Sequence, residues 1–202
     1  LGDVNGDGKL DIITANYSSD NVSVLLNTTV SGSTTPTFAA QASPTTGNGS
    51  EPYSVTLGDV NGDGKLDIIT ANKDVDTASV LLGNGNGTFA TAVNYTTGDI
   101  PKSVTLGDVN GDGILDIITA NSNSDDASVL LGNGNGTFQI PPLATGTEPY
   151  SVTLGDVNGD GILDIITANY DSDNVSVLLG NGNGTFATAV NYGTGNSPSS
   201  VT

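Results

Sequence analysis

Oxygen-bearing side chains recur at alternate positions of a short loop that the chain repeats four times. In the second copy, Asp59, Asn61, Asp63 and Asp67 occupy loop positions one, three, five and nine, and a glycine stands at position six. Such a loop can turn positions one, three and five toward one centre, where the backbone carbonyl of Lys65 at position seven can join them. Hard cations such as Ca²⁺ take about six to eight oxygen ligands. The spacing therefore predicts a calcium site built into a turn.

The four loops agree at every side-chain ligand position, while position seven varies between Lys and Ile, as expected when only its carbonyl is used. Three carboxylates in one loop repel one another unless a cation neutralises them. An ordinary Asn-Gly or Asp-Gly turn is the alternative. Mg²⁺ is disfavoured because it keeps water ligands and demands stricter octahedral geometry. We therefore expect about four Ca²⁺ ions, one per repeat. The predicted ligands are Asp3, Asn5, Asp7, Lys9 and Asp11; Asp59, Asn61, Asp63, Lys65 and Asp67; Asp108, Asn110, Asp112, Ile114 and Asp116; and Asp156, Asn158, Asp160, Ile162 and Asp164.

The charge balance of the 202-residue chain narrows the classes of partner. Its 22 acidic residues against four lysines give a net charge of −18, and 12 of those acids lie in the loops. A chain without a basic patch is a poor partner for nucleic acid. No apolar run approaches the ~20 residues that cross a bilayer, so membrane insertion is not expected. The chain has neither His nor Cys, the usual catalytic bases and nucleophiles, and we expect no enzyme activity.

The loop belongs to a longer repeat. The sequence LGDVNGDG(K/I)LDIITAN occurs at 1–16, 57–72, 106–121 and 154–169, with first aspartates 56, 49 and 48 residues apart. In the second unit, alternating apolar residues and a GNGNG turn predict strands at 53–60, 66–72, 78–82 and 88–94. Four short antiparallel strands in each unit of roughly 50 residues are typical of a β-propeller blade, whereas solenoid repeats are usually shorter. The predicted fold is an all-β propeller of four four-stranded antiparallel blades.

We expect one domain over residues 1–202, with repeats at about 1–52, 53–101, 102–149 and 150–197. Residues 198–202 repeat the SVT that precedes the internal loops, so joining the two ends regenerates the internal sequence. This segment is expected to supply the opening strand of the first blade or of a neighbour. Two arrangements remain open, a closed four-blade ring and a segment of a larger or tandem propeller array.

The loop D-x-N-x-D-G-x-x-D inside a four-stranded repeat resembles the FG-GAP/VCBS repeats, which build integrin α-subunit propellers and many surface and secreted proteins. The resemblance covers nearly the whole chain and implies calcium ligands at the loop residues named above. The chain departs from the integrin pattern because the Phe-Gly and Gly-Ala-Pro signatures are weak or missing. Integrin propellers also have seven blades, so blade number and partner do not carry over.

These observations favour a calcium-stabilised structural or adhesive module, extracellular or at the cell surface, with a tandem or fibre-forming protein as one form of that role. Extracellular calcium modules bind at about 10⁻⁴–10⁻³ M. The expected partners are calcium, other copies of the chain, and cell-surface or matrix components. A carbohydrate-binding, lectin-like propeller is the alternative, in which Tyr53 and Tyr150 of the repeated EPYSVT segment would form the sugar platform. Core packing is the simpler interpretation of these two tyrosines.

Overall fold

The computed structural model describes residues 1–40, 43–139 and 142–202, which form four antiparallel sheets in chain order. We call these sheets blades 1 to 4. The helix among the described residues, η1 (Tyr17–Ser19), has three residues, and no helix in this part of the chain is long and apolar enough to cross a membrane. The strands are β1 (Ile12–Asn16), β2 (Asn21–Asn27) and β3 (Phe38–Ala40) in blade 1; β4 (Pro52–Gly58), β5 (Asp67–Asn72), β6 (Thr77–Leu81) and β7 (Val93–Thr96) in blade 2; β8 (Pro101–Gly107), β9 (Asp116–Asn121), β10 (Asp126–Gly132), β11 (Phe138–Gln139) and β12 (Pro142–Ala144) in blade 3; and β13 (Pro149–Gly155), β14 (Asp164–Asn169), β15 (Asn174–Leu178) and β16 (Val190–Gly193) in blade 4.

The segment DIITAN forms the second strand of each of blades 2 to 4 and is buried at every position. In blade 2 it pairs on one side with β4, where Ile69 faces Thr56, and on the other with β6, where Ile69 faces Val80. β-branched residues suit such a pleated, doubly covered surface. The all-β, propeller-like arrangement of blades is therefore confirmed.

A short chain of polar side chains is buried within this strand. The Thr70 hydroxyl donates to Asn72 Oδ1 at 2.8 Å, and Asn72 Nδ2 donates to the Ser79 hydroxyl at 2.6 Å. The equivalent bonds recur in blades 3 and 4. Among the described residues, no buried side-chain nitrogen or oxygen lacks a partner. Hydrogen bonds offset the desolvation cost of these buried polar groups, which allows a core in a chain that is only 35% hydrophobic.

The hydrophobic core consists of three clusters, each lying between two successive blades. Between blades 2 and 3, Val60 and Val80 of one blade pack with Ile117 and Leu130 of the next. Each interior blade therefore has both faces covered by neighbours, which is how a small sheet with two apolar faces becomes stable.

The strand predictions for blade 2 are confirmed within two residues at each end for the first three strands and are wrong for the fourth. The outer strand β7 begins at Val93 rather than Thr88. Phe89 forms an isolated bridge with Gly83, and the Ala90 N–H donates to the Leu82 carbonyl at 2.8 Å. These bonds close a compact turn, so the chain does not extend until after Ala92.

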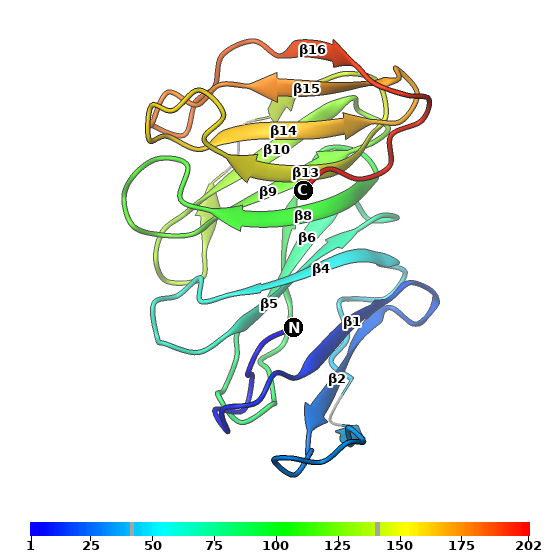
Figure 1. Ribbon diagram of the computed structural model, residues 1–202, viewed down its shortest axis with the longest axis vertical. Helices are drawn as coiled ribbons and strands as arrows, with labels where there is room; N and C mark the ends of the chain where they lie inside the picture. Colours follow the sequence, from blue (N-terminus) through cyan, green and yellow to red (C-terminus); the bar gives the residue numbers. More distant parts are fainter. Residues whose placement is uncertain (41–42, 140–141) are drawn as a thin grey trace.

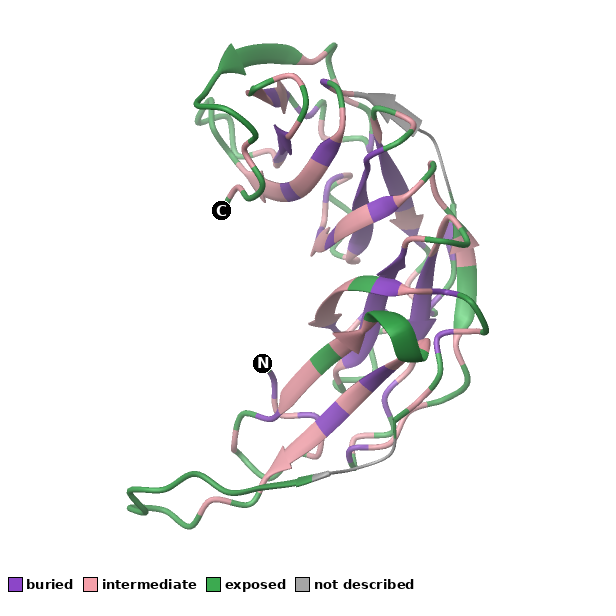
Figure 2. Ribbon diagram, turned by 90° about the vertical axis from the view of Figure 1, so that its right-hand side faces the viewer, coloured by how far each residue is buried: buried purple, intermediate pink, exposed green. Residues whose placement is uncertain are grey.

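The four blades follow an open arc, and the two ends of the chain lie apart on its inner side (Figures 1 and 2). Among the residues that the structure describes, blade 1 has three strands, and β1 pairs with β2 alone. Residues 198–202 do not complete blade 1. They lie beside β13, where the Val201 N–H donates to the Ser151 hydroxyl at 3.3 Å. The closed ring is therefore wrong for this structure, because the turn set by packing blade on blade does not bring the fourth unit round to the first.

Candidate metal centres

The predicted metal loops join the first and second strands of blades 2, 3 and 4 and precede β1 in blade 1. In blade 2, Gly62 and Gly64 have φ angles of 74° and 80°. This left-handed region favours glycine because a Cβ would clash there. The glycine expected at loop position six therefore makes the bend, as it does at the equivalent sites of the other loops.

The aspartate at position one organises each loop. The Asp59 carboxylate accepts N–H bonds from Gly62, Asp63 and Gly64 at 2.7, 3.1 and 2.7 Å. The same three bonds in the other loops measure 2.6–3.2 Å. Backbone N–H donors, led by Gly8 and by Gly161 respectively, hold the pKa of Asp3 and of Asp156 below its ordinary value. This carboxylate is thus ionised and fixed at the centre of its loop.

Positions three and five continue the turn. Asn61 Oδ1 accepts the Asp63 N–H at 3.0 Å, and Asp63 Oδ1 accepts the Lys65 N–H at 3.0 Å. The three side chains at positions one, three and five are therefore linked through consecutive backbone N–H groups, and each keeps further lone pairs on its oxygens. All four loops repeat this arrangement.

The closing aspartate at position nine points into the blade. Asp67 is fully buried, and its two carboxylate oxygens accept the N–H groups of Val60 at 2.9 Å and Gly83 at 2.7 Å. Burial raises the pKa of Asp67 and of Asp116, and the negative charges of the other loop aspartates raise it further. This carboxylate therefore braces the loop against the end of the third strand, in an electrostatic setting that a cation would relieve.

Direct hydrogen bonds thus link positions one, three, five and seven of each loop. In blade 2, the position-nine carboxylate is held instead by two backbone N–H groups, one at position two and one after the third strand. In the described part of the chain, no three acidic side chains form a group that could hold a metal ion through those groups alone. The available donors in each loop are the carboxylates at positions one and five, the amide oxygen at position three and the backbone carbonyl at position seven. The buried carboxylate at position nine lies beneath them. An all-oxygen donor set of net negative charge fits a hard cation.

Comparison with known families decides what this repeat is. A model of the FG-GAP-like repeat matches residues 3–70, 59–119, 108–167 and 156–202. The chain belongs to the FG-GAP-like repeat family. The matches begin at the first aspartate of each loop, so the loop and the strands that follow it form the family's unit. The resemblance expected from the loop sequence is confirmed.

Two of the FG-GAP-like loops contain an ammonium group and two do not. Lys9 Nζ lies 3.4 Å from Asp7 Oδ2, and Lys65 Nζ lies 3.1 Å from Asp63 Oδ2. In blades 3 and 4, where position seven is Ile, the same aspartate oxygen accepts the amide of the position-three asparagine at 2.9 Å. The loops of blades 1 and 2 therefore carry a built-in cation at the position-five carboxylate.

A further aspartate recurs in all four repeats and was not predicted as a functional residue from the sequence. Asp76 Oδ1 accepts the Ile100 N–H at 2.8 Å, which ties the turn after β5 to the start of the next blade. Asp20, Asp125 and Asp173 make the equivalent bond to Glu51, Glu148 and Ser197. Each lies nine residues after the closing aspartate of its loop, and that constant spacing was the signal available in the sequence.

The predicted sugar-platform tyrosines lie at the edge where the first strand of each blade begins. Tyr53 is exposed and meets Tyr17 edge to face at 6.1 Å, and Lys73 Nζ donates to the Tyr17 hydroxyl at 2.7 Å. Tyr150 stacks on Tyr170 at 4.7 Å, with Lys102 Nζ 3.4 Å from the centre of the Tyr150 ring. Neither tyrosine is buried in the core, so the core-packing interpretation is wrong for both.

Several solved structures resemble this chain, and no curated protein matches it. An Agrocybe aegerita lectin, described as recognising non-reducing terminal N-acetylglucosamine, is 24% identical with a TM-score of 0.59, and the match covers 94% of this chain and 50% of the lectin. The V. cholerae biofilm matrix protein Bap1 is 18% identical with a TM-score of 0.34, covering 95% of this chain and 38% of that protein. The chain spans half the length of these proteins or less. The first likeness shows the propeller fold.

Proposed function

We propose that this chain is a calcium-stabilised structural or adhesive β-propeller module that works outside the cell. The observation that carries the proposal is the loop itself. The position-one carboxylate gathers three backbone N–H groups in all four blades, with bond lengths that agree within a few tenths of an ångström. Chance turns would not keep three acids and one amide in the same places four times.

In each loop the side chains at positions one, three and five and the carbonyl of position seven would hold the ion, with the closing aspartate below. A bound Ca²⁺ would supply positive charge to the two carboxylates at positions one and five and to the buried carboxylate at position nine. Four ions would reduce the net charge from −18 to −10. Because the loop exists only in the folded blade, binding contributes directly to folding stability.

The proposed role is structural rather than catalytic, since loops with the same side-chain ligands in every blade provide repeated stability instead of one distinctive pocket. A setting outside the cell follows from the calcium requirement, because modules of this kind are saturated only at about 10⁻⁴–10⁻³ M calcium. Cell-surface or matrix components are the partners that such a module would join.

A thermal melt with excess calcium and with EDTA tests the proposal, together with metal analysis of both samples. We expect metal in the calcium sample and a large fall in melting temperature in EDTA. The variant Asp59→Asn/Asp108→Asn should lose part of that calcium effect. Its matched control, Asp99→Asn/Asp171→Asn, removes the same charge from exposed acids outside the loops and should keep it. A metal-free protein with the same melting temperature in both solutions contradicts the proposal.

Glycan binding is the second candidate, and the exposed tyrosine–lysine edge is the observation that favours it. Aromatic faces beside charged hydrogen-bonding groups are the usual elements of a sugar site, and the structurally similar Agrocybe aegerita protein is a lectin. We expect glycan-array signals that fall in Tyr53→Ala and Tyr150→Ala and persist in Tyr192→Ala, which changes an exposed tyrosine on the outer strand. An empty array with correctly folded protein contradicts this candidate.

A further inference from the structure

Blade 4 turns toward solvent a face that the other three blades bury. Val157, at position two of its loop, is 57% exposed, whereas the equivalent Val4, Val60 and Val109 are 3%, 1% and 1% exposed. Those three valines lie in the clusters that join blade 1 to 2, 2 to 3 and 3 to 4. The exposed face is therefore a fourth copy of one interface, and the three buried copies show in detail what covers it.

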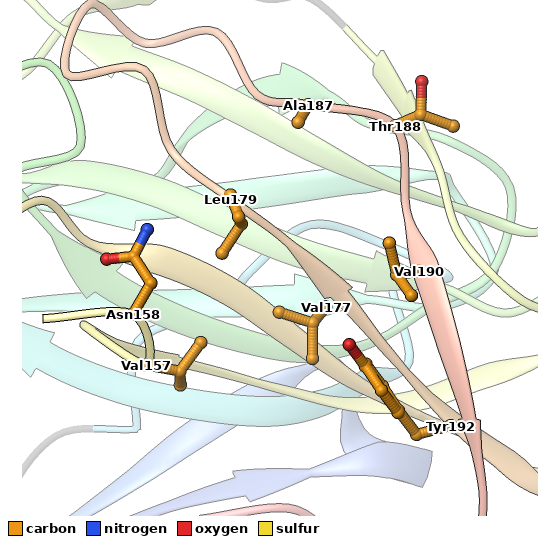
Figure 3. A pocket seen from close by; sticks show the side chains of 8 residues that line it. All are labelled: Val157, Asn158, Val177, Leu179, Ala187, Thr188, Val190 and Tyr192. Carbon is orange, nitrogen blue, oxygen red and sulfur yellow. The ribbon is translucent and has the colours of Figure 1, made fainter. Parts of the chain in front are cut away.

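The face contains an apolar groove of about 380 Å³. Figure 3 shows Val157 of the loop, Val177 of β15, Leu179 just after β15 and Tyr192 of β16 around it. The equivalent residues of blade 2 lie in the core shared with blade 3, where the Tyr95 hydroxyl also donates to the Gly136 carbonyl at 2.9 Å. Those blade 2 equivalents are Val60, Val80, Leu82 and Tyr95.

The glycine directly before each loop marks where the next blade contacts it. A Cβ added to Gly58 would lie 2.5 Å from Leu106 and 3.0 Å from Leu115, both of blade 3. Gly2 and Gly107 are covered in the same way by two leucines of the following blade. A Cβ at Gly155 would meet nothing within 4 Å. The place in front of Gly155 that two leucines occupy at the other three glycines is therefore open, and we call it the hollow at Gly155.

Blade 1 presents the matching pair. Leu1 and Leu10 are 80% and 59% exposed, and they are the equivalents of Leu106 and Leu115. Behind them, Ile12 and Leu25 are only half-buried, whereas their equivalents in blades 2 to 4 are at most 1% exposed. Each later blade packs against the preceding blade through these four positions.

The backbone is complementary as well. Val201 bonds to Ser151 at 3.3 Å as Val104 bonds to Ser54 and Val152 to Ser103, so residues 199–202 already lie where a next blade's first strand would lie. In blade 2 that strand pairs with the second strand, with Val55 opposite Thr70. Within the described part of the chain, no strand pairs with the corresponding edge of β1, which is half-exposed, and such an edge readily accepts an added strand.

We propose that blade 4 and residues 199–202 dock onto blade 1 of a second copy of this chain. Leu1 and Leu10 of the second copy fill the hollow at Gly155, and residues 199–202 pair with its β1, placing Val201 opposite Thr14. The isolated pairing of Gly2 with Asp11 continues the same register. The contact is head to tail, so copies close into a ring or extend into a fibre. The inference rests on the proposed structural role and names its partner.

Sedimentation velocity in calcium, over a wide concentration range, tests the contact with one pair of matched variants. Gly155→Val fills the hollow that receives the leucines, whereas Gly193→Val adds the same side chain at an outer-strand position that is equally open within the monomer. We expect the wild type and Gly193→Val to associate and Gly155→Val to stay monomeric. A wild-type chain that is monomeric throughout, or a Gly155→Val variant that associates equally well, overturns the proposal.

Cysteine pairing tests the register independently, because the chain has no cysteine of its own. Opposite residues of antiparallel strands lie about 4.5–5.5 Å apart, within the span of a disulfide. Mixing Val201→Cys with Thr14→Cys under oxidation should give a cross-linked pair, and mixing Gly193→Cys with Thr14→Cys should not. Equal cross-linking in both mixtures would overturn the register. The calcium melt tests the structural role separately, so a calcium-dependent protein that never associates refutes only the docking.

Discussion

Replacing Asp116 by alanine tests whether the closing aspartate braces its blade independently of metal. Its buried carboxylate accepts the N–H groups of Val109 at 2.9 Å and Gly132 at 2.8 Å. Alanine leaves both donors without an acceptor, and each buried unsatisfied donor costs about 1–3 kcal/mol, or about 2–6 kcal/mol together. A chain of this size loses about 2–4 °C in melting temperature per kcal/mol. We therefore expect a fall of at least about 4 °C.

The measurement is a thermal melt in EDTA, so that loss of a metal ligand cannot explain the result. Burial and the charges of Asp112 and Asp108 raise the pKa of Asp116, so alanine also removes an electrostatic penalty and the fall should lie toward the lower end of the range. Asp99→Ala, an exposed acid outside the loops, is the control and should change little. An Asp116→Ala protein that melts with the wild type in EDTA would refute the bracing role.

Four further substitutions have defined outcomes. Lys65→Ile removes the ammonium beside the position-five carboxylate, and calcium titration calorimetry should show that loop binding about two- to fivefold tighter; unchanged or weaker binding would contradict this. Tyr95→Phe removes the hydroxyl bond to Gly136 and should lower the free energy of unfolding in urea by about 1 kcal/mol. Gly58→Ala pushes a Cβ against a leucine of blade 3 and should cost about 1–3 kcal/mol, whereas Gly155→Ala should lie within about 0.5 kcal/mol of the wild type. Equal effects at the two glycines would contradict the blade-packing argument.

The sequence was enough to predict the blades and the loops because both are local. DIITAN occurs in every repeat, so the single prediction of a strand at 66–72 was confirmed within one residue as Asp67–Asn72 and applied to the equivalent strands of blades 3 and 4. The ligand positions formed a turn because the glycines at positions four and six permit one backbone path. Because the pattern repeats, a local prediction made for one unit extended to the fold of the whole chain.

What the sequence did not predict depends on neighbours in space. Whether residues 198–202 close a ring is set by the turn between packed blades, which no single repeat encodes. The direction of the Asp67 carboxylate, into the blade and onto Gly83, became visible only with the third strand in place. The aspartates typified by Asp76 were overlooked because their partner is a backbone N–H of the following blade, although their constant spacing was present in the sequence.

The contact between a pair of leucines and a glycine is the same at all three blade junctions. A junction of this kind does not depend on which blade stands on either side of it. Loss or duplication of one whole unit would therefore leave every remaining junction intact, and the length of such a protein can change by unit steps without any other adjustment. Stability should then grow with each added unit.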